Sequence, residues 1–200
     1  MIASVVFDLG GVLIDWNPRH LYRKLFADMA EMDYFLDHIC PQSWNEHQDA
    51  GRPLAEATAI QCAAFPEYRE LICAYYGRWD EMLVGAIQGT VDLLNALNAS
   101  NIPLYALTNW SAETFPIAQA RYEFLKLFRD IVVSGEEKLA KPNPAFFHRL
   151  QHRCALQPHR TLFIDDNLAN IQSARRLGYH VHHFRDPQRL AAELSERRLL

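Results

Sequence analysis

The hydrophobic pattern begins with a short apolar run, Val5-Val6-Phe7, which ends at a single carboxylate, Asp8. An apolar run of this length, rich in β-branched residues, predicts a buried strand. Gly10 and Gly11 follow, and glycine permits backbone angles and close approaches that a Cβ atom would block. We therefore expect Asp8 to lie at the end of a strand, beside a turn with accessible backbone N–H groups.

From about Val91 onwards, strand-like and helix-like patterns alternate. The expected strands are Ile102–Leu107, Ile131–Val133, Thr161–Ile164 and His180–Phe184. The expected helices are Val91–Leu97, Ser111–Tyr122, Asn143–Cys154, Asn167–Leu177 and Pro187–Arg198. Strands that alternate with helices form right-handed βαβ units. The pattern predicts an α/β protein with a Rossmann-like parallel sheet and helices on both of its faces.

The segment 16–85 differs, because its apolar residues recur at helical spacing and show no strand-like alternation. We expect an all-helical domain at 16–85, inserted into a core formed by residues 1–15 and 86–200. Within it, the polar stretch Trp44–Arg52 is expected to connect two helices in solvent. The alternative is a specificity loop that faces an active site.

Composition and charge narrow the classes of protein. The chain has 200 residues, 50% of them hydrophobic, and a net charge of -4. No stripe of Lys or Arg is present, which argues against nucleic acid as a partner. The apolar runs are far shorter than a membrane span. The four cysteines form no Cys-x-x-Cys pair and are expected to be reduced thiols. We expect a cytoplasmic monomer that does not bind membranes.

Polar residues follow most of the expected strands, where ligands bind in an open parallel sheet. They are Asp8, Thr108-Asn109, Lys138 with Lys141, and Asp165-Asp166-Asn167. Each has a local alternative, because Thr, Asn and Asp also cap helices and a lysine can be a surface charge. Their coincidence at one edge of the sheet favours a single site.

These residue types suit phosphoryl transfer. Asp8 can attack phosphorus and form an acyl phosphate. Asp8, Asp165 and Asp166 would lie close together, and like charges that close must either take up protons or hold a cation. Oxygen ligands without His or Cys favour Mg²⁺. Lys141 and Thr108 can bind phosphoryl oxygens through a positive charge and a hydroxyl group. The predicted ligand is a small phosphorylated molecule.

Four motifs occur in order, and together they carry a resemblance that covers nearly the whole chain. They are Phe7-Asp8-Leu9-Gly10-Gly11-Val12, Leu107-Thr108-Asn109, Lys141-Pro142 and Phe163-Ile164-Asp165-Asp166-Asn167. The chain resembles the haloacid dehalogenase-like (HAD) hydrolase superfamily, with a helical cap inserted after the first motif. It is most similar to the small-cap phosphatases of bacteria, including the alpha-D-glucose-1-phosphate phosphatase type. The Glu46-His47-Gln48 stretch and the Asp-Asp-Asn motif carry that narrower similarity.

The resemblance implies a Mg²⁺-dependent phosphatase that hydrolyses a small phosphomonoester, above all a sugar phosphate, through an aspartyl phosphate on Asp8. Asp8 would be the nucleophile and a metal ligand. The carbonyl group of Gly10 and the carboxylate of Asp166 would complete the ligand set, and Asp165 would bind the metal directly or through its water shell. Phosphate would be held by three residues, of which the last also pairs with Asp8: Thr108, Asn109 and Lys141.

One position departs from the pattern. Most phosphatases of this superfamily carry a second aspartate two residues after the nucleophile, where it acts as general acid and base, and here that position is Gly10. General acid-base catalysis contributes roughly a hundred- to ten-thousand-fold. Its absence implies slow turnover, a good leaving group such as that of a sugar 1-phosphate, or a substitute from the cap. Glu46 and His47, which are also expected to bind substrate, are the candidates.

Two other functions stay open. Dehalogenases of the same superfamily also lack the second aspartate, attack carbon and need no metal, but their fourth motif is not an acidic pair like Asp165-Asp166. With Gly10 in the acid position, the chain could instead be a non-catalytic module that binds phosphate or a partner. The intact Asp8, Lys141 and acidic pair favour the phosphatase over both.

Overall fold

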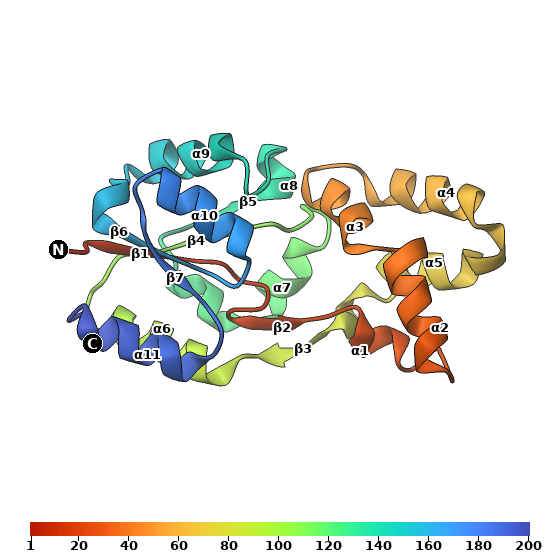
Figure 1. Cartoon of the computed structure of the whole chain (residues 1–200), viewed down its shortest axis with the longest axis horizontal. Coiled ribbons are helices and arrows are strands. Elements are labelled where there is room, and N and C mark those ends of the chain that lie inside the picture. The colour runs from red at the N-terminus through yellow and green to blue at the C-terminus, as the bar shows by residue number, and fades with distance from the viewer.

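The computed structural model describes all 200 residues, which form a sheet-containing body and a helical part beside it (Figure 1). The body holds a five-stranded sheet in the order β5-β4-β1-β6-β7, and every neighbouring pair in it is parallel. Its strands are β1 (Ser4–Phe7), β4 (Leu104–Thr108), β5 (Asp130–Val133), β6 (Thr161–Asp165) and β7 (His180–His183). The predicted parallel α/β sheet is confirmed.

Helices cover both faces of this sheet, as expected. Two lie on one face, α9 (Pro144–Cys154) and α10 (Leu168–Arg176). On the other face lie α6 (Gln88–Ala99), α7 (Phe115–Arg121) and α11 (Pro187–Glu196). Asn143 and Asn167 cap α9 and α10 by accepting a backbone N–H with their side chains. A short helix, α8 (Ser134–Glu137), follows β5 directly.

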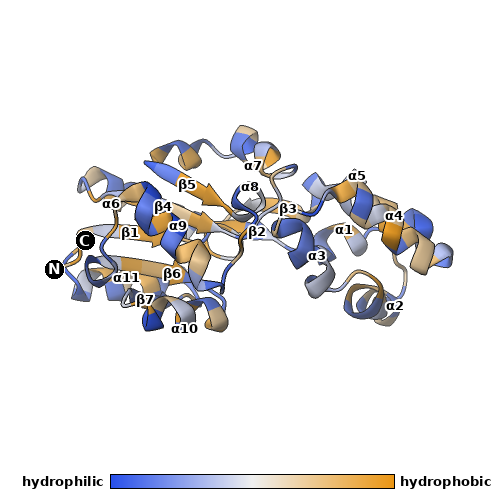
Figure 2. Cartoon of the chain, turned by 90° about the horizontal axis from the view of Figure 1, so that it is seen from above, coloured by the Kyte–Doolittle hydropathy of each residue, from blue (hydrophilic) through white to orange (hydrophobic).

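The alternation of side chains along the strands builds a core on each face. Val6 and Phe163 pack under α9 and α10, whereas Val5, Phe7 and Ile164 point to the opposite face. Because both faces are covered, the strands read as continuous apolar runs. Figure 2 shows this pattern, with hydrophobic residues on the strands and hydrophilic residues on the outer surfaces of the helices.

The helical part, residues 17–82, is called the cap below. Its helices are α1 (Arg19–Tyr22), α2 (Met29–Tyr34), α3 (Gln42–Asp49), α4 (Leu54–Ala64) and α5 (Arg69–Gly77), with a π-helical turn at Phe35–Ile39 and 3-10 turns at Pro66–Tyr68 and Trp79–Met82. Aromatic rings fill its centre. The ring centroids of Tyr22 and Phe35 are 4.9 Å apart, and those of Trp44 and Tyr75 are 5.1 Å apart. These rings belong to the same continuous hydrophobic cluster as the core on the α6, α7 and α11 face of the sheet.

The expectation that segment 16–85 contains no strand is wrong at its two ends. β2 (Ile14–Trp16) and β3 (Leu83–Ala86) pair as an antiparallel ribbon that joins body and cap. Strands of three and four residues are too short to show alternation, and their partners lie far apart in the sequence. The predicted boundaries, 15/16 and 85/86, fall inside this ribbon.

The expectation of a solvated connection at Trp44–Arg52 is also wrong for most of its residues, because α3 occupies them. This helix buries Trp44, Asn45, Gln48 and Asp49, which lie on one face. Three of these four residues are polar, so hydrophobic spacing does not reveal the helix. Elsewhere, the four cysteines are unpaired, and no helix combines the length and apolar character that crossing a membrane requires.

Gly135 provides a test of how closely α8 packs on the loop after β4. A Cβ atom at Gly135 would lie 2.4 Å from the backbone nitrogen of Ala112, whereas a Cβ atom at Gly77 would meet nothing within 4 Å. Gly135→Ala should lower the free energy of unfolding by about 1–3 kcal/mol because of overpacking. Gly77→Ala, in the last position of α5, should raise it by roughly 0.4–1 kcal/mol. Urea denaturation measures the free energy of unfolding of both variants. An unchanged free energy of unfolding in Gly135→Ala would contradict the close packing.

Candidate active site

Parallel pairing brings the polar residues after three neighbouring strands to one edge of the sheet. β1 lies between β4 and β6, with Phe7 opposite Ala106 on one side and Ile164 on the other. The residues that follow these strands therefore converge, and they include Asp8 after β1, Asn109 after β4 and Asp166 after β6. Lys141 reaches the same place from the loop that follows α8. The structure brings these sequence motifs together as one site.

Lys141 is the centre of this site. Its side chain is fully buried, and its Nζ atom lies 2.9 Å from Oδ2 of Asp8 and 2.7 Å from Oδ2 of Asp165. Asn109 fixes the backbone of Lys141 in both directions, since its Nδ2 donates to the Lys141 carbonyl and its Oδ1 accepts the Lys141 N–H. Burial lowers the pKa of Lys141, but the two carboxylates outweigh burial and raise it above its ordinary value. Lys141 is thus a permanently charged group between two acids.

Asp165 is fully buried and its oxygens are engaged by the protein itself. Oδ1 accepts the backbone N–H of Asn167 and both oxygens accept Nδ2 of Asn170, in addition to the bond from Lys141. A carboxylate offers about four lone-pair positions, so little capacity is left for a metal ion. Asp165 therefore orients Lys141. Asn170, on the first turn of α10, is a site residue that the sequence analysis missed.

The ionised form of Asp8 is disfavoured in this arrangement. Its Oδ1 accepts the backbone N–H of Leu9 at 2.7 Å. Burial raises its pKa to about 8, Lys141 opposes the rise, and the neighbouring charges of Asp165 and Asp166 add to it. A nucleophilic carboxylate must be ionised to react, so a further positive charge beside Asp8 would favour its reactive form.

The carboxylates of Asp8 and Asp166, which lie beside the engaged Asp165, fit a divalent cation. One oxygen from each of Asp8, Asp165 and Asp166 lies within 4.8 Å of the others. Three carboxylates against one lysine leave an uncompensated negative charge, and burial followed by the charge of Asp165 raises the pKa of Asp166. Gly11 makes the arrangement possible, because it has a φ of +73° and its Cβ atom would lie 2.4 Å from Oδ2 of Asp166. The hard oxygen donors suit Mg²⁺.

Thr108 lies at the end of β4 and is completely buried, and its hydroxyl group has no hydrogen-bond partner in the protein. A buried hydroxyl without a partner costs free energy, so such groups call for an explanation. An anion bound beside Asp8 would supply the missing acceptor.

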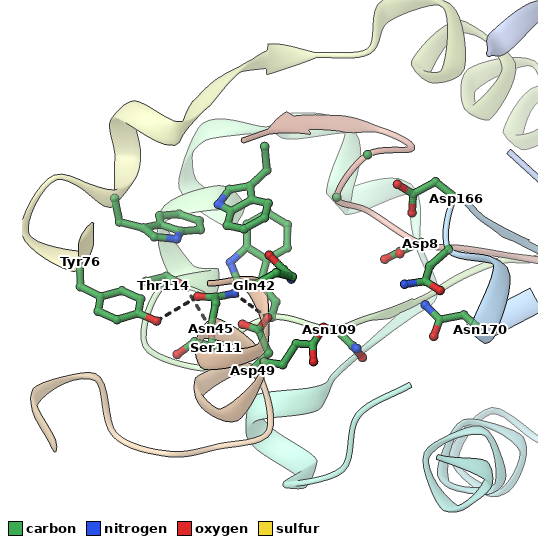
Figure 3. A pocket seen from close by; sticks show the side chains of 17 residues that line it. Asp8, Gln42, Asn45, Asp49, Tyr76, Asn109, Ser111, Thr114, Asp166 and Asn170 are labelled. Atoms are coloured by element: carbon green, nitrogen blue, oxygen red, sulfur yellow. Dashed lines mark hydrogen bonds between the residues drawn. The ribbon is translucent and has the colours of Figure 1, made fainter. Parts of the chain in front are cut away.

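A cavity of about 430 Å³ opens between this sheet edge and the cap (Figure 3). Asp8, Asp166 and Asn170 lie at one end of it, and Asn45, Asp49 and Tyr76 of the cap lie at the other. Indole rings contribute to the walls, from Trp16, Trp79 and Trp110. No Lys, Arg or His lines the cavity.

The two cap residues singled out from the sequence have different positions. Glu46 lines the cavity and is exposed, whereas His47 is exposed and does not line it. The buried acid of the cap is instead Asp49, which the sequence analysis missed. Burial raises the pKa of Asp49 to about 7, the backbone N–H of Ser111 opposes the rise, and Glu46 adds to it.

A directional chain of hydrogen bonds orients Asp49. Arg52 donates to Oε1 of Gln48, whose Nε2 donates to the hydroxyl of Tyr76. Tyr76 donates to Oδ1 of Asn45, and Nδ2 of Asn45 donates to Oδ2 of Asp49 at 2.9 Å. The i, i+4 spacing of Asn45 and Asp49 on a polar helix is the one sequence signal that could have indicated this cluster.

Comparison with known proteins gives one family. Residues 2–178 match the model of the haloacid dehalogenase-like hydrolases. Among curated proteins, a sesquiterpene phosphatase of Aspergillus oryzae is 24% identical over 96% of this chain and 95% of its own length. A phosphoglycolate phosphatase of Escherichia coli is 28% identical over 88% of this chain and 79% of its own length.

Solved structures share the fold. A HAD-like family hydrolase from Porphyromonas gingivalis has a TM-score of 0.75 at 22% identity and covers 98% of each chain. A HAD family enzyme from Bacteroides thetaiotaomicron, in complex with magnesium and inorganic phosphate, has a TM-score of 0.67 at 24% identity, over 93% of this chain and 96% of its own. L-2-haloacid dehalogenase from Xanthobacter autotrophicus scores 0.66 at 15% identity, over 100% and 85% of the two chains.

Replacing Lys141 tests the charge balance of the site. Lys141→Met leaves Asp8 and Asp165 buried without their counter-ion, so the free energy of unfolding, measured in chelator, should fall by about 3–5 kcal/mol. The matched control is Lys126→Met, whose lysine is 71% exposed and pairs only with Glu123. That control should change stability by about 0.5 kcal/mol or less. Equal effects of the two substitutions would show that Lys141 has no special role in the fold.

Proposed function

Because the chain belongs to the haloacid dehalogenase-like hydrolase family, we propose that it is a Mg²⁺-dependent phosphatase that hydrolyses a small phosphomonoester through an aspartyl phosphate on Asp8. The observation that carries the proposal is the charge of the sheet edge. Lys141 pairs with Asp8 and Asp165, Asp166 lies close to both carboxylates, and burial raises the pKa of Asp8 to about 8. A divalent cation offsets both effects.

Each residue of the sheet edge has a role in this proposal. Asp8 and Asp166, with the carbonyl oxygen of Gly10, would hold Mg²⁺, which keeps Asp8 ionised and offsets the charge of the phosphate. Asp8 attacks phosphorus, and the unpartnered hydroxyl of Thr108 and the ammonium of Lys141 bind phosphoryl oxygens. Asn109 and Asp165 act by fixing Lys141 in place.

The lining of the cavity supports a sugar phosphate as substrate. Amide and hydroxyl groups are available for sugar hydroxyls, from Gln42, Asn45, Ser111 and Thr114, and indole rings form part of the walls. A phosphomonoester with a carboxylate in its leaving group, such as phosphoglycolate, would find no cation to pair with. The same lack argues against 2-haloacids, and a dehalogenase has no use for an acidic pair that binds Mg²⁺.

Phosphate release is the direct test. With Mg²⁺, the wild type should release phosphate from sugar phosphates and from an aryl phosphate. It should act on phosphoglycolate at least roughly tenfold more slowly, because the carboxylate of this substrate is repelled by the acidic side chains of the cavity. Chelator should abolish release because it removes the cation that balances the charge. Asp8→Asn should abolish release because it removes the nucleophile. Halide release from 2-chloropropionate, or Mg²⁺ binding without any turnover, would contradict the phosphatase and support the dehalogenase or the binding module.

Gly10 permits a test of the missing general acid. A Cβ atom at Gly10 would meet no heavy atom within 4 Å, so the first atom of a side chain fits there without displacing its surroundings. Gly10→Asp should raise kcat/KM for sugar phosphates roughly tenfold or more, because the sugar is a poor leaving group that needs a proton from the new aspartate. The kcat/KM for an aryl phosphate should stay nearly unchanged, because the aryl oxide leaves without protonation. Gly10→Ala is the control for added volume. Equal gains on both substrates would argue against an acid role for this position.

A further inference from the structure

The cap end of the cavity holds an acid without a cation. Asp49 is only 9% exposed, and its one hydrogen-bonding side-chain partner is the neutral amide of Asn45. Buried charges in proteins are normally paired, and Asp49 has no Lys, Arg or His beside it in the cavity. Burial raises the pKa of Asp49 to about 7, and no positively charged side chain opposes the rise.

The surrounding hydrogen bonds are arranged for the ionised form of Asp49. The Tyr76 hydroxyl donates to Oδ1 of Asn45, and this bond turns Nδ2 of Asn45 towards Asp49 as a donor. Donors to this carboxylate, from Asn45 and the backbone of Ser111, favour its charged state, and about four acceptor positions leave capacity for a further donor. The cap thus supports a carboxylate that lacks only its positive partner.

The cavity walls suit the same partner. Trp16, Tyr76, Trp79 and Trp110 contribute aromatic surface, and the rings of Trp79 and Trp110 meet edge to face with centroids 5.5 Å apart. The faces of Trp and Tyr attract organic ammonium groups through their quadrupoles. Aromatic walls alone would also suit a neutral sugar, but a neutral ligand would leave Asp49 without a counter-ion.

Contacts with the body place Asp49 relative to Asp8. Ser134, the first residue of α8, donates its hydroxyl to the backbone carbonyl of Asp49 and accepts the backbone N–H of Trp110. Asp49 is therefore tied to the loop after β4, which also carries Asn109. A ligand that reaches from the sheet edge to the cap would meet Asp8 at one end and Asp49 at the other (Figure 3).

From this geometry we propose that the cavity selects phosphomonoesters whose leaving group carries an ammonium group, with Asp49 as the counter-ion. The proposal rests on the phosphatase function and specifies its substrate class. Among sugar phosphates it favours amino sugar phosphates. The titratable groups that face Asp49 are Glu46 on its own helix and Tyr75 and Tyr76 on α5. Lys138, the residue after α8, lies next to Gly51 and does not line the cavity.

Two substrate pairs that differ in charge provide the test. One pair is glucosamine 6-phosphate and glucose 6-phosphate, and the other is choline phosphate and its neutral carbon isostere, 3,3-dimethylbutyl phosphate. In the wild type with Mg²⁺, kcat/KM should favour the charged member of at least one pair by roughly ten- to a hundredfold, as expected for a charge-assisted contact. Asp49→Asn should reduce that ratio to near one, mainly through KM, and should leave activity on an aryl phosphate in place.

The pH dependence adds a readout that a purely structural role would not change. The choline group keeps its charge at every pH, so the preference for choline phosphate should rise between pH 6 and pH 8 as Asp49 loses its proton. The preference should be flat in Asp49→Asn. Glu56→Gln, a change to an exposed carboxylate on α4 outside the cavity, is the matched control and should keep the wild-type ratio.

The outcomes are distinguishable. If the wild type favours neither charged substrate, or if Asp49→Asn lowers the activity on all substrates alike, the ammonium site is refuted while the phosphatase function stands. If the wild type releases no phosphate even from the aryl phosphate, the proposed function itself fails. A preference lost in Asp49→Asn and kept in Glu56→Gln supports the proposal.

Discussion

A single ammonium group buried between two carboxylates is the interaction on which the sheet edge depends. Lys141 lies within 3 Å of Asp8 and Asp165, and it does so only because Asn109 clamps its backbone and Asn167 and Asn170 hold Asp165. Burying these charges is costly unless every partner is in place. With Asp166 included, the three carboxylates exceed the one lysine by two negative charges, and this excess suits a divalent cation.

The sequence predicts those parts of the structure that follow from local hydrophobic patterns, and not those that depend on contacts between distant segments. Asp8, Thr108, Lys141 and the pair Asp165-Asp166 follow apolar runs, and parallel strands bring such residues together, so this end of the site could be expected before any coordinates. The cap end could not. Asn45 and Asp49 lie on a helix whose buried face is polar, and β2 and β3 are paired only through contacts between distant segments. Hydrophobic spacing carries no information on either.

The two ends of the cavity thus divide the chemistry between them. In the proposed phosphatase, the sheet edge provides the groups for the phosphate, which is the same in every phosphomonoester. Asn45, Asp49 and Tyr76 of the cap line the other end of the cavity, where the leaving group would lie. Curated relatives with 24% and 28% identity bear names with different substrates.

The position of β1 has a consequence for the order in which the protein matures on the ribosome. β1 is synthesised before the other four strands of its sheet, yet it lies in the middle of that sheet, and Ser4 pairs with Thr161, 157 residues later. Contacts at such separations form slowly, because a long loop must close first. The site around Asp8 therefore cannot assemble until Lys141, Asp165 and Asp166 have been synthesised. A truncated polypeptide would leave β1 unpaired, with its apolar side chains exposed. Chaperones and proteases act on such exposed apolar segments.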